Sequence, residues 1–316
     1  MPADLELEVW HDTIQEKLVQ DNSFLSQVAD VSSDNIINGT IVHLPQAGEP
    51  STVVKNRSVF PATPKRRTDG QVLYAIDEYT SDPVHIPNAE TVELSYDKRR
   101  SVLDQDIQNL SEEVAEGMLT NFIVSPVGTN ATLPTTSILE TSGNTVASGL
   151  AGTTGNRKAY SLSDLQKLQN FLIKQKAWNE GQMNVLLTAD AAIQMFPADS
   201  AITATYMASV SEAERRSGIM YKAQGFNIFV RSSVYSLAGD KTFKAYGSVV
   251  SPTDCEGIFA WNKNMVEKAI GATKAFGNVG DATMYGDVYS FLVRMGGRAR
   301  RKNFEGLVIM KQAAAA

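Results

Sequence analysis

The segment from residue 101 to residue 122 carries a single apolar stripe at helical spacing, and it constrains the fold more than any other part of the 316-residue chain. The members of the stripe lie three or four positions apart: Leu103, Ile107, Leu110, Val114, Met118 and Phe122. Residues at this spacing share one face of a helix. The pattern therefore predicts a long surface helix of about six turns, roughly 33 Å in length, with one buried face.

Before this helix, the chain has strand-like segments without the pattern of a compact domain. Between residues 50 and 92, short β-like runs such as 71–76 are separated by prolines and charged residues. The run Lys65-Arg66-Arg67 stands next to Asp69-Gly70, a turn signal of hairpins. Two long strands with so few apolar residues indicate a projecting arm with a basic tip.

After the helix, the sequence changes twice. Residues 125–160 are rich in Thr, Ser, Gly and Asn, which is typical of a connecting segment. From 160 to about 280, apolar runs of helical and strand type alternate, which predicts a compact α/β domain. It includes a helix that opens at Ser161, a buried strand at 185–189, a short helix at 191–195 and another helix at 264–269. Two last strands, at 287–295 and 306–310, are expected to form a hairpin through the basic segment 296–302.

Composition argues against catalysis. The 43% of hydrophobic and 20% of charged residues are typical of a folded protein. The single cysteine, Cys255, rules out an intrachain disulfide and a cysteine-rich zinc site. The glycine run at 149–155 lacks the lysine of a phosphate-binding loop and is expected to be a connection. We therefore predict no catalytic, cofactor-binding or metal-binding residue, and only three histidines occur: His11, His43 and His85.

The charge is distributed unevenly along the chain. The net charge is −6, and residues 1–60 alone carry nine acidic and three basic residues. Residues 291–316 carry six basic residues and one acidic residue, a local charge of +5. An acidic beginning and a basic end favour head-to-tail contacts between copies, although two independently solvated surfaces would look the same. No apolar window is long enough to span a bilayer, so we expect no membrane association.

Several short motifs resemble the major capsid proteins of tailed double-stranded DNA bacteriophages, which have the Hong Kong 97-type fold. The motifs are Val42-His-Leu-Pro-Gln-Ala-Gly, Glu78-Tyr-Thr-Ser-Asp-Pro-Val-His-Ile-Pro, Glu93-Leu-Ser-Tyr-Asp-Lys-Arg-Arg-Ser-Val-Leu, Val185-Leu-Leu-Thr-Ala-Asp and Gly257-Ile-Phe-Ala-Trp. The resemblance covers most of the chain and rests on the order of the elements.

The resemblance implies an α+β chain in five parts. These are an N-terminal arm (1–48), an extended E-loop hairpin (49–92), the first part of a peripheral domain with its spine helix at about 101–122 and a connector (93–159), an α/β axial domain (160–282) and the second part of the peripheral domain (283–316). Because the E-loop would begin near residue 50, a scaffolding segment at the N-terminus has no room. We therefore expect a separate scaffold protein.

The resemblance also implies a function. The chain would be a structural protein of the virion, assembled in the host cytoplasm as hexamers and pentamers into the icosahedral head around the genome. Its partners would be other copies of itself, the scaffold, a portal and cement proteins, with only weak nonspecific contact to DNA. Two alternatives stay open at this point: a cytoplasmic α/β enzyme with an unrecognised site, and another virion protein of the tail tube or of the decoration.

Charge and placement suggest which residues join neighbouring copies. Basic side chains of the E-loop would face acidic side chains of the spine helix, and salt bridges between copies fit these runs better than phosphate contacts because no aromatic residues are interleaved. The predicted contact residues are Arg57, Lys65, Arg66 and Arg67 on the E-loop, and Glu112, Glu113 and Glu116 on the spine helix.

Overall fold

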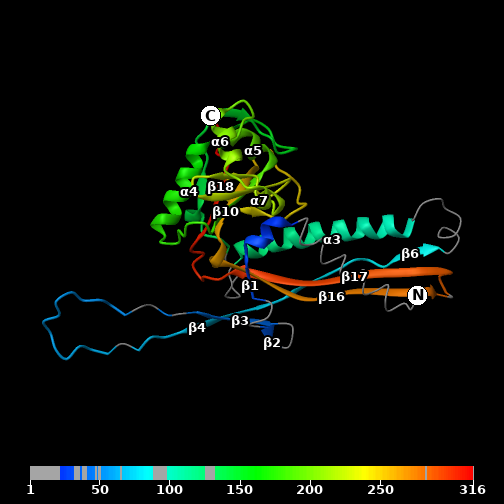
Figure 1. The fold of residues 1–316 in the computed structure, drawn as a ribbon, viewed down its shortest axis with the longest axis horizontal. Coiled ribbons are helices and arrows are strands. Elements are labelled where there is room, and N and C mark those ends of the chain that lie inside the picture. Colours follow the sequence, from blue (N-terminus) through cyan, green and yellow to red (C-terminus); the bar gives the residue numbers. More distant parts are fainter. Residues whose placement is uncertain are drawn as a thin grey trace.

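The computed structural model describes residues 22–31, 36–37, 41–46, 48, 51–64, 66–87, 98–124, 132–281 and 283–315. Three parts are evident in Figure 1: a lobe of sheet and short helices, a long helix above a two-stranded ribbon, and a thin hairpin that projects away from both. The predicted N-terminal arm lies mostly outside the described residues, as does Lys65.

The long helix α3 (Lys98–Ile123) confirms the helix predicted from the apolar stripe. All six members of the stripe are buried. They face the antiparallel ribbon of β16 (Val266–Asp281) and β17 (Gly286–Ala299), where every second side chain of β17 from Tyr289 to Met295 is buried in the same core. A strand alternates its side chains between two faces, so β17 offers the helix one continuous apolar face.

Short strands extend this ribbon into a five-stranded sheet. The strands β5 (Asp77–Thr80) and β6 (Val84–Pro87) pair antiparallel with β17, and β1 (Ala29–Asp30) pairs parallel with β16. Gly117 of α3 allows β5 to approach the helix, because a Cβ at this position would lie 1.9 Å from the hydroxyl oxygen of Tyr79. The 3-10 helix η1 (Ser23–Gln27) precedes β1 and contributes Phe24 and Leu25 to the core.

The lobe is built on an eight-stranded sheet. Its strands are β7 (Ile138–Glu140), β10 (Met183–Thr188), β11 (Tyr221–Ala223), β12 (Phe226–Arg231), β13 (Tyr235–Leu237), β14 (Phe243–Lys244), β15 (Cys255–Asn262) and β18 (Leu307–Lys311). Its helices are α4 (Leu162–Lys174), α5 (Ala189–Met195), α6 (Ala201–Ala208) and α7 (Glu212–Arg216). A small hairpin of β8 (Thr145–Ala147) and β9 (Asn156–Lys158) and the turns η2 (Thr135–Ser137) and η3 (Lys263–Met265) complete it.

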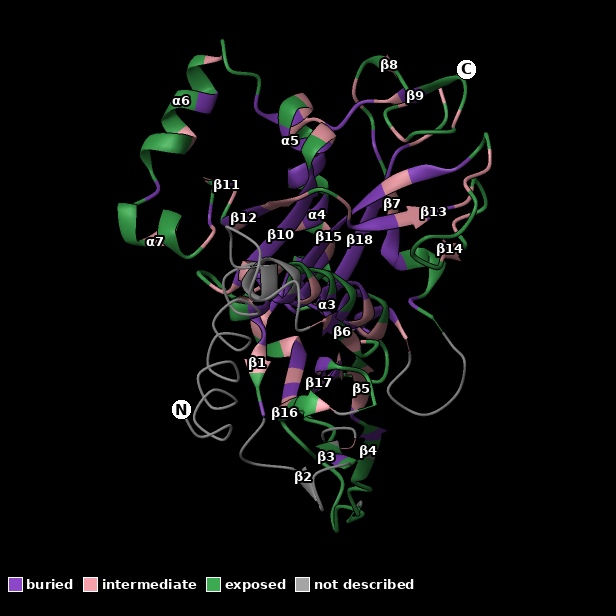
Figure 2. Cartoon of the chain, turned by 90° about the vertical axis from the view of Figure 1, so that its right-hand side faces the viewer, coloured by how far each residue is buried: buried purple, intermediate pink, exposed green. Residues whose placement is uncertain are grey.

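Two cores lie on the two faces of this sheet. Along β15, Phe259 and Trp261 belong to the core shared with α3, whereas Ile258 and Ala260 belong to the core shared with α4 and α5. All six residues of β10 are buried. A strand covered on both faces must be apolar at successive positions, which explains the continuous run Val185-Leu-Leu. Figure 2 shows the sheet as the most buried part of the molecule.

The projecting hairpin consists of β3 (Ile41–Gln46) and β4 (Gly70–Ala75), with β2 (Ile36–Ile37) beside β3. The two long strands pair from Ile41 with Ala75 to Gln46 with Gly70. Every described residue between 51 and 70 is exposed, as Figure 2 also shows. The strands at 77–80 and 84–87, which were expected to belong to the E-loop of 49–92, instead pair with β17. The hairpin therefore begins and ends earlier than the sequence predicts.

Two predictions about the C-terminal third are wrong. The segment 264–269, expected to be a helix, instead forms part of the turn η3 and the start of β16, because residues 266–270 pair with β17. The expected hairpin of 287–295 with 306–310 does not form, since β18 pairs with β15 in the lobe. In consequence β16, expected in the axial domain, lies under α3, and β18, expected in the peripheral domain, lies in the lobe.

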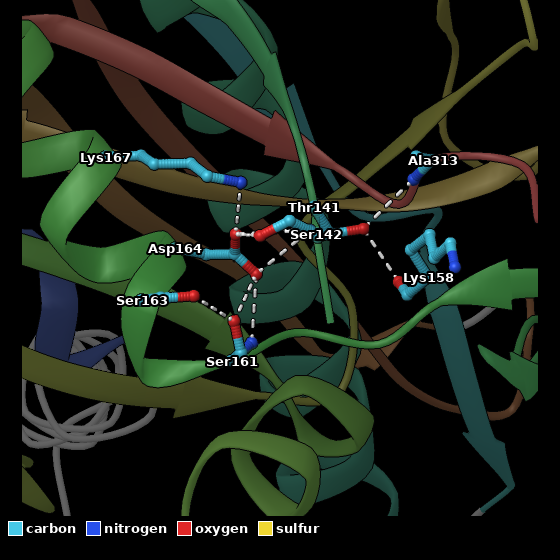
Figure 3. Close-up of polar contacts among 8 residues, drawn as sticks. All are labelled: Thr141, Ser142, Lys158, Ser161, Ser163, Asp164, Lys167 and Ala313. Atoms are coloured by element: carbon cyan, nitrogen blue, oxygen red, sulfur yellow. Dashed lines mark hydrogen bonds and ion pairs between the residues drawn. The ribbon is translucent and has the colours of Figure 1, made fainter. Parts of the chain in front are cut away.

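Asp164 ties the connector to α4 (Figure 3). Its buried carboxylate accepts hydrogen bonds from the backbone N–H of Ser161 at 3.0 Å and from the Ser142 hydroxyl at 2.9 Å, and it forms an ion pair with Lys167 at 2.8 Å. Thr141, next to Ser142, donates to the Lys158 carbonyl and accepts from the N–H of Ala313. Asp164 therefore joins the connector to the start of α4, and Thr141 joins it to the end of the chain.

We expect Asp164→Ala to lower the free energy of unfolding by about 3 kcal/mol, because several donors lose a buried charged acceptor together. Denaturant unfolding of the protein measures this loss. Ser163→Ala is the matched control, since Ser163 lies one position earlier, is exposed and contacts only the hydroxyl of Ser161 in Figure 3. Equal midpoints for the two variants would contradict the prediction.

Candidate inter-subunit surfaces

The tip of the hairpin presents basic and apolar side chains together. Arg57, Arg66 and Arg67, three of the predicted contact residues of the E-loop, are all exposed. In the same segment Val53 and Phe60 are 92% and 75% exposed, and Val54 and Val59 are exposed as well. Apolar side chains this exposed, gathered at one tip, are typical of a surface that another protein covers.

Arg67 is partly engaged within its own chain. Its Nε lies 2.6 Å from Oδ1 of Asp69, and the same oxygen accepts a hydrogen bond from the N–H of Gly48 at 2.8 Å. The Gly48 bond, followed by the Arg67 bond, lowers the pKa of the Asp69 carboxyl below its ordinary value. Asp69 therefore stays charged and pairs with Arg67 within the hairpin, whereas Arg57 and Arg66 are exposed.

An acidic groove lies between α3 and the strands β5 and β6. Its volume is about 510 Å³, and four carboxylates line it: Glu78, Asp82, Asp106 and Glu113. Tyr79, Val84 and Leu110 supply an apolar floor. Burial raises the pKa of Asp106 above its ordinary value. The groove thus combines negative charge with apolar surface, which is the complement of the hairpin tip.

The three predicted acidic residues of the spine helix have three different positions. Glu113 is exposed and lines the acidic groove. Glu112 is exposed one residue earlier and accepts a hydrogen bond from the hydroxyl of Tyr246 at 3.0 Å, which raises the pKa of Tyr246. Glu116 points into the protein and is buried. The structure therefore brings only Glu113 into the groove.

Glu116 is not available to another subunit. Its Oε1 lies 2.5 Å from Nη1 of Arg231 and accepts a hydrogen bond from the hydroxyl of Ser233 at 3.0 Å. Both charged side chains are largely buried, and the Arg231 guanidinium also lies 6.0 Å from the ring centroid of Phe24. This corrects the prediction of a contact residue: Glu116 joins α3 to the end of β12 within one chain.

The groove residues Glu78, Asp82 and Asp106 were not among the predicted contact residues. A signal existed for Asp106, because it precedes Glu113 by two helical turns and therefore shares its face of α3. No such signal exists for Glu78 and Asp82, because they reach the groove through the pairing of β5 with β17, a strand about two hundred residues later in the sequence.

The tip and the groove of one subunit face away from each other. In Figure 1 the hairpin extends to one side of the lobe, and α3 with β6 extends to the opposite side. A single chain therefore cannot place its own tip in its own groove. If the two surfaces meet, they do so between copies arranged head to tail.

Other functional groups are sparse in the part of the chain that the structure describes. It contains no group of three or more His, Cys, Asp or Glu residues that could hold a metal ion. Cys255 is buried, and burial raises the pKa of its thiol. Among the same residues, no helix is both long and apolar enough to cross a membrane.

No family model matches the chain, and no curated protein matches it. Solved capsid structures do. The chain is similar to a protein chain in the capsid of Ralstonia phage GP4, with a TM-score of 0.60, 12% identity and coverage of 92% of this chain and 88% of that chain. It is also similar to a chain in the capsid of cyanophage P-SCSP1u, with a TM-score of 0.58, 16% identity and coverage of 92% and 86% of the two chains. For a chain in the capsid of cyanophage Pam1, the TM-score is 0.60, the identity 10% and the coverage 92% and 89%. The chain therefore has the Hong Kong 97-type capsid fold that the sequence predicts.

Proposed function

We propose that this chain is the major capsid protein of a tailed double-stranded DNA phage, which assembles as hexamers and pentamers into the icosahedral head. One observation carries the proposal: a capsid fold projects a hairpin whose tip exposes apolar and basic side chains that its own chain does not cover. A hairpin of this kind reaches its full stability only against a neighbour. The protein is then structural, and no catalytic step is part of its function.

We propose further that the hairpin tip lies in the acidic groove of the next copy. Arg57 and Arg66 would face the carboxylates at Glu113 and Asp106, while Val59 and Phe60 would cover the apolar floor. Opposite charges at a shared surface favour this pairing over wrong arrangements. A contact between two different surfaces, repeated head to tail, closes into rings when the rotation allows.

The proposed division of the chain follows the sheets. The axial domain is the lobe with its eight-stranded sheet, and it includes β18. The peripheral domain is α3 with the five-stranded sheet, and it includes β16. As further partners we propose a separate scaffold protein, a portal and cement proteins, with assembly in the host cytoplasm, final location in the virion and weak contact to packaged DNA.

Expression of the chain alone, and with a candidate scaffold protein, tests the proposal by negative-stain microscopy. We expect closed shells with a mass in the megadalton range, because each subunit offers two complementary surfaces. A monomer or small oligomer in both cases would contradict a capsid function and would favour the α/β enzyme. Tubes without caps, or binding only to preformed shells, would point instead to the tail tube or to a decoration protein.

A further inference from the structure

The hairpin meets the rest of the molecule at a narrow joint. β4 ends at Ala75 and β5 begins at Asp77, so a single residue separates the hairpin from the strand that pairs with β17. That residue, Ile76, is buried. Gly296 of β17 admits it, because a Cβ at Gly296 would lie 3.1 Å from the Cα of Ile76. The few residues around Ile76 therefore set the direction in which the whole hairpin projects.

One buried hydrogen bond crosses this joint from a side chain of the hairpin. The Tyr74 hydroxyl of β4 donates to Oε1 of Glu267 on β16 at 2.8 Å. Glu267 has no exposed surface, and its Oε2 lies 3.2 Å from Nε of Arg300. The Arg298 guanidinium lies 5.7 Å from the centroid of the Tyr74 ring. A buried carboxylate with one charged partner, Arg300, and one phenol donor, Tyr74, has a strongly preferred geometry.

The apolar part of the joint is small. Tyr74 and Ile76 pack with Val31, Val42 and Ala269 in a five-residue cluster separate from the two large cores of the molecule. So few apolar contacts resist rotation weakly, since burial stabilises in proportion to area. Burial raises the pKa of Glu267, whereas the bond from Tyr74 and the charge of Arg300 lower it. The phenol thus helps to keep the carboxylate charged.

We infer that Tyr74 and Glu267 form a latch that fixes the direction of the hairpin relative to the β16–β17 ribbon, so that Tyr74 is a positioning residue for assembly. The inference rests on the proposed function. The tip lies at the far end of a long hairpin (Figure 1), so a small rotation at the joint moves it far from the groove that it must enter. Rings close only when every copy presents its tip in the same direction.

The variant Tyr74→Phe removes the hydroxyl and keeps the ring. Spin labels at Ser58→Cys on the exposed tip and Gln166→Cys on the exposed face of α4 report the direction of the hairpin by double electron–electron resonance in soluble subunits. Loss of a hydrogen bond to a buried charged group should raise the population of displaced hairpins about tenfold. The matched control is Tyr160→Phe, which loses a buried hydroxyl bond to the Glu256 carbonyl inside the lobe.

A broader or second distance in Tyr74→Phe, absent from Tyr160→Phe, supports the latch. Identical distance distributions for wild type and Tyr74→Phe overturn it, and so does equal broadening in both variants, which would reflect general loss of stability. Assembly is the second measurement: we expect Tyr74→Phe to give irregular or open particles where Tyr160→Phe gives closed shells. If the wild type forms no shells, the proposed function fails, and the distances in soluble subunits still decide on the latch.

Discussion

Reversal of Arg66 and Arg67 to glutamate should leave a folded, soluble subunit that forms no closed shells. Both side chains are exposed, so the reversal removes no buried packing; it breaks the exposed ion pair of Arg67 with Asp69, and such surface pairs contribute little to stability. In the assembled state, however, the two new carboxylates would face the four carboxylates of the acidic groove. Like charges brought together at an interface cost several kcal/mol, about the size needed to reverse a weak subunit contact. Circular dichroism of the subunit and microscopy of the product measure the two expectations.

Two further variants make this result specific. Reversal of Asp106 and Glu113 to lysine in the same chain should restore shells, because two basic residues of the tip and two of the four groove carboxylates then exchange their charges. The matched control reverses Arg215 and Arg216 on α7 to glutamate, since these neighbouring arginines are also exposed but lie far from the hairpin in the lobe. Normal shells from the tip variant would contradict the pairing of tip and groove, and failure of the exchanged variant would show that the tip has another partner.

Local periodicity predicts the helices that bury one continuous face. The stripe from Leu103 to Phe122 specifies both the existence of α3 and its buried side, because spacing and burial have the same cause. The helix at Ser161 was also predictable, since its capping box with Asp164 is a local pattern. In both cases the information lies within a few turns of the residues concerned.

Partners distant in the sequence were not predictable in this way. β18 is expected to form a hairpin with β17, although its run Leu307-Val-Ile-Met lacks the alternation of a strand with one covered face. That run has the signature of a strand buried on both sides, and all five residues of β18 are buried. Burial on both faces suits β18 to the lobe, where it pairs with β15.

The acidic residues of α3 illustrate the same limit at a single site. Glu112, Glu113 and Glu116 look equivalent in the sequence, since each is a glutamate on the polar side of a helical pattern. What separates them is Arg231, a residue 115 positions away that binds Glu116 from the end of β12. The burial of Glu116 therefore depends on its contact with Arg231, whereas the position of Glu113 in a groove depends on the neighbouring strands β5 and β6.

Glu116→Ala should consequently destabilise the subunit by about 3 to 5 kcal/mol, the usual effect of removing one member of a buried ion pair. Arg231 would be left with the Ser233 carbonyl and the ring of Phe24, and neither neutralises its charge. Denaturant unfolding of the soluble subunit, followed by fluorescence, gives the change in the free energy of unfolding. The loss should fall on the contact between α3 and the lobe, which hydrogen exchange of β12 would locate.

Glu113→Ala is the matched control, three positions earlier on the same helix. Because Glu113 is exposed, its removal should change the free energy of unfolding by no more than about 0.5 kcal/mol, while it weakens assembly by removing one carboxylate from the groove. Glu116→Ala should show the reverse order of effects: a large loss of stability, and assembly reduced only as far as unfolding removes subunits. The two variants are expected to differ in stability because only Glu116→Ala leaves a buried charge, that of Arg231, without its partner. Similar stabilities would therefore mean that the pair of Glu116 with Arg231 does not hold α3 to the lobe.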